Sequence, residues 1–264
     1  KHFELPLDES KRDDLHRLET RVIVLQNRNT FYGATYRWNE EGTEAFLLET
    51  RETAEFEVRT PSGTRRHTWM FPGPGDCKMC HNKVAGTVLG VNVRQLNLEA
   101  RDPATGELFN QLEAWRHAGL IAGKEIPEEA DEEVKKKPVV NINWPRLPAL
   151  EDESASLEDR SRAYFDVNCA HCHQPKGSGK GLFDFRYHVP LAYQGLSEAN
   201  VRGVEEGVKR LLVPGKPEKS VLYYRLLTAD YHRMPPIGRS VADEQAAEVV
   251  GRWIRSLPAE SKKQ

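Results

Sequence analysis

The first quarter of the chain consists of short apolar runs separated by polar ones, a pattern typical of β-strands. The runs are rich in β-branched and aromatic residues, which favour strands; they cover residues 19–26, 31–38, 44–49, 54–60 and 65–71. The intervening stretches "QNRN", "NEEGT" and "PSG" are typical of turns. Short connections between successive strands predict an antiparallel sheet or small sandwich. We assign this β-rich module to residues 1–71.

From residue 72 the pattern becomes irregular and then helical. The stretches "VRQLNLEA" and "LFNQLEAWRHAGLI" place apolar residues at helical spacing: Leu108, Leu112, Trp115 and Leu120. Gly119 is the expected end of that helix. The charge-dense stretch 123–138 is typical of a solvated linker. Residues 72–150 therefore form a second unit in this interpretation.

Residues 151–264 carry the clearest helical patterns. "SLEDRSRAYFDVN" predicts a helix with Ser156 as its N-cap and Asp159 three residues on. "SVADEQAAEVVGRWIRSL" predicts an amphipathic helix in which Gly251 lets another helix approach closely. Its apolar side holds Ala246, Val249, Val250, Trp253 and Ile254. A further helix is expected after a Pro-Gly turn, with Ser220 as its cap. The prediction is an α+β protein, with a β-sheet followed by two mostly helical units.

The overall charge of the chain limits the classes of partner. Among its 264 residues 30% are charged, with a formal net charge of −2. A nucleic-acid-binding protein is normally basic, so this class is not favoured. No apolar run approaches the length of a membrane span.

The four cysteines of the chain are confined to two short stretches. "DCKMCH" contains Cys77 and Cys80, and "NCAHCH" contains Cys169 and Cys172. Each stretch reads Cys-x-x-Cys-His, and the adjacent histidines are His81 and His173.

Three chemistries compete for such a pair of motifs. Zinc favours four ligands from two pairs a few tens of residues apart, but this gap is longer and zinc gives no reason for the following histidine. A thioredoxin-like disulfide needs its cysteines at the start of a helix after a strand, inside a βαβ pattern, and the flanks show no such strand. Covalent haem accounts for both cysteines and the histidine of each motif, because the two thiols add to the vinyl groups of the haem and the histidine ligates the iron. We therefore expect two covalently bound haem c groups.

The sixth iron ligand of the second haem is expected to be Met234. Its thioether is a good ligand for haem iron, and Pro235 and Pro236 stiffen the polar loop that carries it. The alternative is that Met234 fills the core.

The sixth ligand of the first haem is less obvious, and we predict Met70. This residue precedes Cys77 by seven positions, enough chain to cross from one face of a haem to the other. Met79 lies between the two cysteines, on the proximal side. His67, His117 and a vacant position are the alternatives.

Several stretches of the chain resemble those of a known protein family. "NCAHCH", "RMPP" and "GRWIRSL" resemble the class I cytochrome c fold. The wider chain resembles a diheme c-type cytochrome module of secreted bacterial proteins, some of which carry a sugar-dehydrogenase-like propeller. That similarity rests on "GATYRWNEEGTEA", "WMFPGPGDCKMCH", "VLGVNVRQLN", "RAYFDVNCAHCHQPKG", "LLVPGKPEKSVLYYRLL" and "RMPPIG".

The resemblance implies electron transfer between redox partners outside the cytoplasmic membrane. The abrupt start "KHFELPLDES" indicates a mature fragment or one module of a longer protein.

Two other functions are compatible with the same motifs. A diheme peroxidase would need one open haem and an acid-base group, for which the loose candidates are His67, His117, His171, His188 and His232. A binding module with structural haems is the third reading. The β-rich module could also contact carbohydrate through Tyr32, Tyr36 and Trp38.

Overall fold

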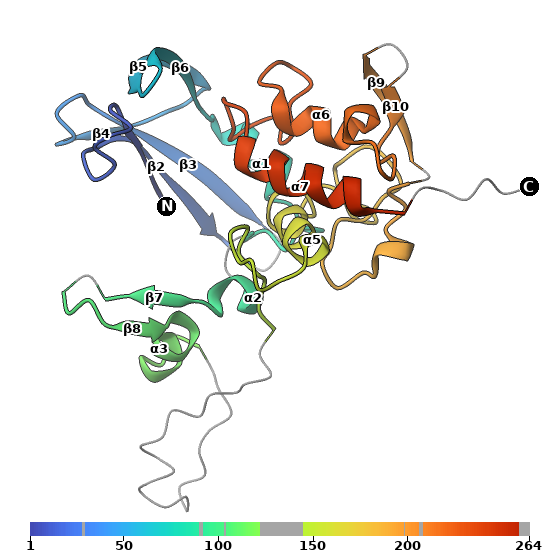
Figure 1. The fold of residues 1–264 in the computed structure, drawn as a ribbon. Helices are drawn as coiled ribbons and strands as arrows, with labels where there is room; N and C mark the ends of the chain where they lie inside the picture. Colours follow the sequence, from blue (N-terminus) through green and yellow to red (C-terminus); the bar gives the residue numbers. More distant parts are fainter. Residues whose placement is uncertain are drawn as a thin grey trace, which may run out of the picture.

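The computed structural model describes residues 1–27, 30–89, 92–102, 104–121, 145–197, 199–205 and 208–258. A β-rich N-terminal part lies beside a helical C-terminal part (Figure 1). The prediction of an α+β protein that begins with an antiparallel sheet is confirmed. The predicted linker 123–138 lies outside the described residues.

The N-terminal part contains six antiparallel strands. Four form one sheet in the order β1-β2-β3-β4: β1 (His2–Pro6), β2 (Leu15–Leu25), β3 (Phe31–Trp38) and β4 (Ala45–Leu47). The other two form a hairpin, β5 (Glu52–Thr60) and β6 (Gly63–Phe71). All five predicted strands are present, and β1 is an additional strand. A small core joins the sheet to the hairpin through buried Leu18, Leu48 and Phe71.

The middle of the chain is less helical than its periodicity predicts. It contains α1 (Pro74–Cys80), α2 (Val93–Leu96), β7 (Glu99–Arg101), β8 (Leu108–Asn110) and α3 (Gln111–His117). The predicted helix through Leu108 was wrong at its start, since Leu108 lies in β8 and is exposed. Asn110 causes this boundary, because its side chain accepts hydrogen bonds from the backbone N–H groups of Leu112 (3.0 Å) and Glu113 (3.1 Å).

The end of α3 follows the prediction. Gly119 has a φ of +70°, a conformation that glycine adopts easily, and it lies just after the helix. Leu112 is buried on α3, but Leu120 lies beyond the helix and is 68% exposed. The apolar spacing therefore extends further along the chain than the helix does.

The C-terminal part packs three helices around an aromatic core. These are α5 (Leu157–Asn168), α6 (Val221–Leu227) and α7 (Glu244–Ser256). Two 3₁₀ turns, η1 (Leu191–Tyr193) and η2 (Pro217–Lys219), and a short hairpin of β9 (Asn200–Glu205) and β10 (Val208–Arg210) complete it. Phe165 of α5 and Trp253 of α7 are fully buried in the core, with ring centroids 5.8 Å apart.

The predicted caps and contacts of these helices are mostly correct. The Ser156 hydroxyl accepts a hydrogen bond from the Asp159 N–H (3.0 Å) at the start of α5. The five predicted apolar residues of α7 are buried. A Cβ at Gly251 would lie 2.8 Å from a ring carbon of Tyr223 on α6, so the close helix approach is confirmed.

Ser220 differs from the prediction. It lies at the N-cap position of α6, but its hydroxyl makes no capping hydrogen bond to that helix. The hydroxyl instead accepts from the Val213 N–H and donates to the Lys216 carbonyl, each at 2.9 Å. Ser220 therefore holds together the loop that precedes the helix.

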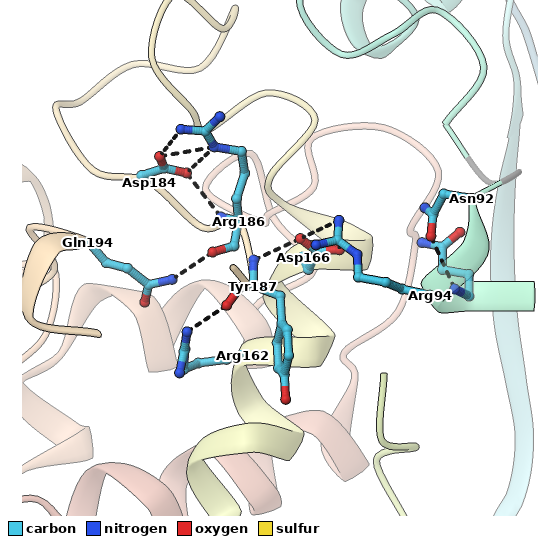
Figure 2. Close-up of polar contacts among 9 residues, drawn as sticks. Asn92, Arg94, Arg162, Asp166, Asp184, Arg186, Tyr187 and Gln194 are labelled. Carbon is cyan, nitrogen blue, oxygen red and sulfur yellow. Dashed lines mark hydrogen bonds and ion pairs between the residues drawn. The ribbon is translucent and has the colours of Figure 1, made fainter. Parts of the chain in front are cut away.

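Polar contacts connect residues 1–121 to the part of the chain that follows residue 144. Arg94 of α2 forms an ion pair with Asp166 of α5 at 3.3 Å (Figure 2). The Arg94 carbonyl also accepts a hydrogen bond from the Leu147 N–H (3.1 Å), where the chain returns toward α5. His67 of β6 reaches the loop before α7, with its Nε2 atom 3.0 Å from the Ser240 hydroxyl. Among the described helices, none is long and apolar enough to cross a membrane.

Candidate functional site

The first Cys-x-x-Cys-His motif lies on α1. The Asp76 carboxylate accepts a hydrogen bond from the Gly73 N–H (3.0 Å) and pairs with the Arg51 guanidinium, which fixes the start of this helix. Strand β6, which the sequence predicts over residues 65–71, precedes α1. That strand belongs to an antiparallel hairpin, however, so the strand and helix do not form the βαβ unit of a thioredoxin-like site.

Cys77 is pressed against the middle of β3. A Cβ atom built on Gly33 would lie 2.4 Å from the Cys77 sulfur and 2.8 Å from its Cβ. Only glycine therefore permits α1 to approach the sheet this closely. Burial raises the pKa of the Cys77 thiol.

A buried ion pair lies behind this helix, and sequence reasoning missed it. Glu19 of β2 has no exposed surface; it pairs with Arg21, and it accepts a hydrogen bond from the Trp69 indole N–H (3.0 Å). The second carboxylate oxygen of Glu19 is buried and has no hydrogen-bond partner in the part of the chain that the structure describes. The charges of Arg21 and Glu19 act in opposite directions on the pKa of Cys77, after the larger effect of burial.

His81 is held in the orientation of a metal ligand. Its Nδ1 atom lies 2.6 Å from the Thr87 carbonyl oxygen. When Nδ1–H donates to a carbonyl, the tautomer is fixed and Nε2 keeps its lone pair for a metal. Thr87 adopts this position with a φ of +67°, which is uncommon for a residue other than glycine.

The second motif follows α5 directly. Cys169 is the C-cap of this helix, and the N–H groups of Cys172 (3.1 Å) and His173 (2.9 Å) both donate to its carbonyl. The glycine-rich loop that follows packs closely on the motif. A Cβ on Gly179 would lie 2.5 Å from the His173 Nδ1 atom, and one on Gly177 would lie 2.2 Å from the Cys172 carbonyl oxygen.

Aromatic residues enclose His173. Its ring stacks on Phe183 with centroids 4.7 Å apart, and Phe185 meets it edge-on at 5.8 Å. Burial lowers the pKa of His173, so the ring is neutral at pH 7, the form that binds a metal. Its Nδ1 atom is buried and has no hydrogen-bond partner within the described residues. Burial also raises the pKa of Cys169 to about 12.

A polar network holds the segment that carries the two phenylalanines (Figure 2). Arg162 of α5 donates to the carbonyl oxygens of Tyr187 (2.6 Å) and Val189 (2.7 Å). Asp166 of α5 accepts from the Tyr187 N–H at 2.8 Å, and the Asp184 carboxylate pairs with Arg186. The loop therefore stays fixed to α5, with Phe183 and Phe185 against His173.

The two motifs meet in space although they are far apart in the sequence. Three donor atoms lie within 4.8 Å of one another: the sulfur of Cys80, the sulfur of Cys172 and a ring nitrogen of His171. The Met79 carbonyl accepts hydrogen bonds from the Ser178 hydroxyl (3.0 Å) and the Cys172 thiol (3.5 Å). All four cysteines are free thiols. The hydrogen bond between the two thiols raises the pKa of Cys80 and lowers that of Cys172.

Met234 lies half-buried in the loop after α6. Its N–H donates to the Arg225 carbonyl at 3.2 Å. The charge of Arg225 acts on His173, where it adds to the effect of burial in lowering the pKa. The backbone of Met234 is thus hydrogen-bonded to Arg225, whose charge lowers the pKa of His173. The role of the Met234 sulfur as an iron ligand stays a prediction.

Met70 and His67 occupy opposite faces of β6, because side chains alternate along a strand. Met70 is half-buried. His67 is 5% exposed and stacks on Trp69, and its Nδ1 atom is buried without a partner within the described residues. Burial lowers the pKa of His67. The choice of Met70 as a ligand also stays a prediction.

The remaining predicted residues are spread over the molecule. His117 is exposed at the end of α3, His188 is exposed, and His232 packs against Tyr231 with ring centroids 3.8 Å apart. Tyr32, Tyr36 and Trp38 do share one face of β3, opposite the face that carries Gly33.

Comparison with protein-family models, curated proteins and solved structures gives no match for this chain, so the functional argument rests on its own residues.

Proposed function

We propose that the chain is a diheme c-type cytochrome, which carries electrons between redox partners outside the cytoplasmic membrane. The observation that carries this proposal is that every cysteine belongs to a Cys-x-x-Cys-His motif, and all four remain free thiols. A structural disulfide would consume the thiols, whereas haem attachment requires them free.

The residues around both motifs fit a covalently held haem. Thiols and neutral imidazoles are the donors that haem c uses. His81 has its Nδ1 atom occupied by the Thr87 carbonyl and its Nε2 atom free for iron. His173 lies in an aromatic enclosure that keeps it neutral. When bound, each haem supplies an iron that changes between the ferrous and ferric states by one electron.

The protein's own residues would hold and tune these groups. Cys77 and Cys80 anchor the first haem, and Cys169 and Cys172 anchor the second. His81 and His173 would each ligate one iron, and Met70 and Met234 are the proposed second protein ligands. Phe183 and Phe185 exclude water from the proximal side of the second site, and such burial is one of the factors that set a reduction potential.

The proposed location and partners follow from the cofactor and from the resemblance to diheme modules of secreted bacterial proteins. The electron donor or acceptor would be a redox protein or dehydrogenase. A carbohydrate contact of the β-rich module through Tyr32, Tyr36 and Trp38 is a further proposal; of these three, Trp38 lines a concave region of about 490 Å³. Loss of oligosaccharide binding in Trp38→Ala, measured by calorimetry, would support that contact, and absence of binding to the unmodified chain would exclude it.

The cofactor proposal is tested by mass spectrometry of the denatured, matured chain. We expect the mass of the polypeptide plus two haems. Cys77→Ser with Cys80→Ser should remove one haem, and Cys169→Ser with Cys172→Ser should remove the other. A fully matured chain that carries no haem, or only one, would show that the proposal is wrong.

A further inference from the structure

The second cysteine of each motif lies close to the other motif. Cys80, Cys172 and His171 bring three donor atoms within 4.8 Å of one another. Cys77 instead contacts β3 at Gly33, and Cys169 ends α5. The geometry thus selects one thiol from each motif and adds a histidine that no haem-attachment argument uses.

Independent contacts hold these three residues together. The Ser178 hydroxyl and the Cys172 thiol both donate to the carbonyl of Met79, the residue before Cys80. The Gly179 N–H donates to the Cys172 carbonyl at 2.8 Å. On the other side, α1 is fixed by its close packing on β3. The donor set is therefore preformed by the fold.

We propose that the chain, before haem is attached, binds one thiophilic divalent cation such as Zn²⁺ through Cys80, Cys172 and His171. Two sulfurs and one imidazole nitrogen are a preferred donor set for zinc, with water in the fourth position. Around a tetrahedral zinc the donor atoms lie about 3.5–3.8 Å apart, judged from usual bond lengths. Because the three atoms already lie within 4.8 Å of one another, a contraction of at most about 1.3 Å would meet that spacing.

Binding would convert both thiols to thiolates and release their protons to the solvent. A cation at this site would occupy one of the two thiols that each haem needs. Zinc binding and haem attachment would therefore exclude each other at both motifs.

The probe for this site is Co²⁺, added to the reduced, haem-free, full-length chain. We expect one equivalent to bind and to give the visible and near-ultraviolet absorption of a tetrahedral thiolate complex. Cys80→Ser and Cys172→Ser should each abolish these bands, and His171→Ala should weaken binding more than tenfold. Cys77→Ser and Cys169→Ser are the matched controls, in which the bands should persist.

A second measurement uses the unmodified chain and so does not depend on how a variant folds. Bound Zn²⁺ should protect Cys80 and Cys172 from alkylation, as mapped by peptide mass spectrometry, while Cys77 and Cys169 stay reactive. Protection of both cysteines within one motif, or no binding of Co²⁺ at one equivalent, would overturn the proposal. Haem attachment is measured on the matured chain, so the two proposals succeed or fail separately.

Discussion

Replacement of Gly33 by alanine tests whether α1 and β3 are as close as the structure shows. The added Cβ would lie 2.4 Å from the Cys77 sulfur and 2.8 Å from the Cys77 Cβ. Non-bonded heavy atoms normally lie about 3.5–4.0 Å apart. The helix would therefore have to move by about 1 Å, and Cys77 would move with it.

The size of the effect follows from two opposing contributions. Extra atoms in a packed site destabilise by about 1–3 kcal/mol. Alanine is better than glycine inside a strand by about 0.5–1 kcal/mol. We expect Gly33→Ala to lower the free energy of unfolding by about 0.5–2 kcal/mol, with reduced attachment of the first haem and full attachment of the second.

Urea unfolding followed by tryptophan fluorescence measures the stability, and mass spectrometry counts the haems. Gly75→Ala is the matched control, because Gly75 lies on the same helix and a Cβ there meets no atom within 4 Å. That control should gain up to about 1 kcal/mol from helix propensity. If Gly33→Ala is as stable as the unmodified chain and carries its first haem in full, the close packing of α1 on β3 is wrong.

Three further predictions concern the axial ligands and the start of α1. Met234→Ala should remove the weak red absorbance of a ferric methionine–iron bond and lower the potential of the second haem; an unchanged spectrum and potential would make Met234 a packing residue. Met70→Ala should convert the first haem to high spin and leave the second intact, whereas a persistent low-spin, bis-histidine spectrum would transfer the role to His67. Asp76→Asn should destabilise the chain by up to about 1 kcal/mol at pH 7, because asparagine can still accept from the Gly73 N–H but loses the charge that pairs with the partly exposed Arg51. Arg51 lowers the pKa of Asp76, so this stabilisation is complete above the ordinary carboxyl pKa and is lost as the pH falls through the lowered value; unfolding curves that differ equally at pH 7 and pH 2 would contradict it.

The sequence predicted the strands and helices that are determined by neighbouring residues. The strands of the N-terminal part follow from β-branched and aromatic runs, and α5 begins at Ser156 because a serine hydroxyl caps it. The helix predicted from Leu108 failed for a local reason as well. Apolar spacing there fits a helix, but Asn110 caps one two residues later and Leu108 pairs with Arg101 in the β7–β8 hairpin.

The approach of the two motifs could not be predicted, because it depends on tertiary contacts. Nothing in "DCKMCH" indicates that the Met79 carbonyl accepts a hydrogen bond from Ser178. The only sequence signal is the glycine-rich "KGSGKG" after His173, which is typical of a backbone that packs closely on its neighbours. The isolated ion pair of Glu19 and Arg21 likewise gave no signal, since charged residues on strands are usually exposed.

The hydrogen bond between the Leu147 N–H and the Arg94 carbonyl has a consequence for how the length of this chain can vary. Leu147 contacts Arg94 within α2, and Arg94 is also paired with Asp166 of α5. The entropic cost of closing a loop grows only slowly with its length. Insertions or deletions between these two anchors would therefore change the size of the protein while both cysteine motifs keep their places.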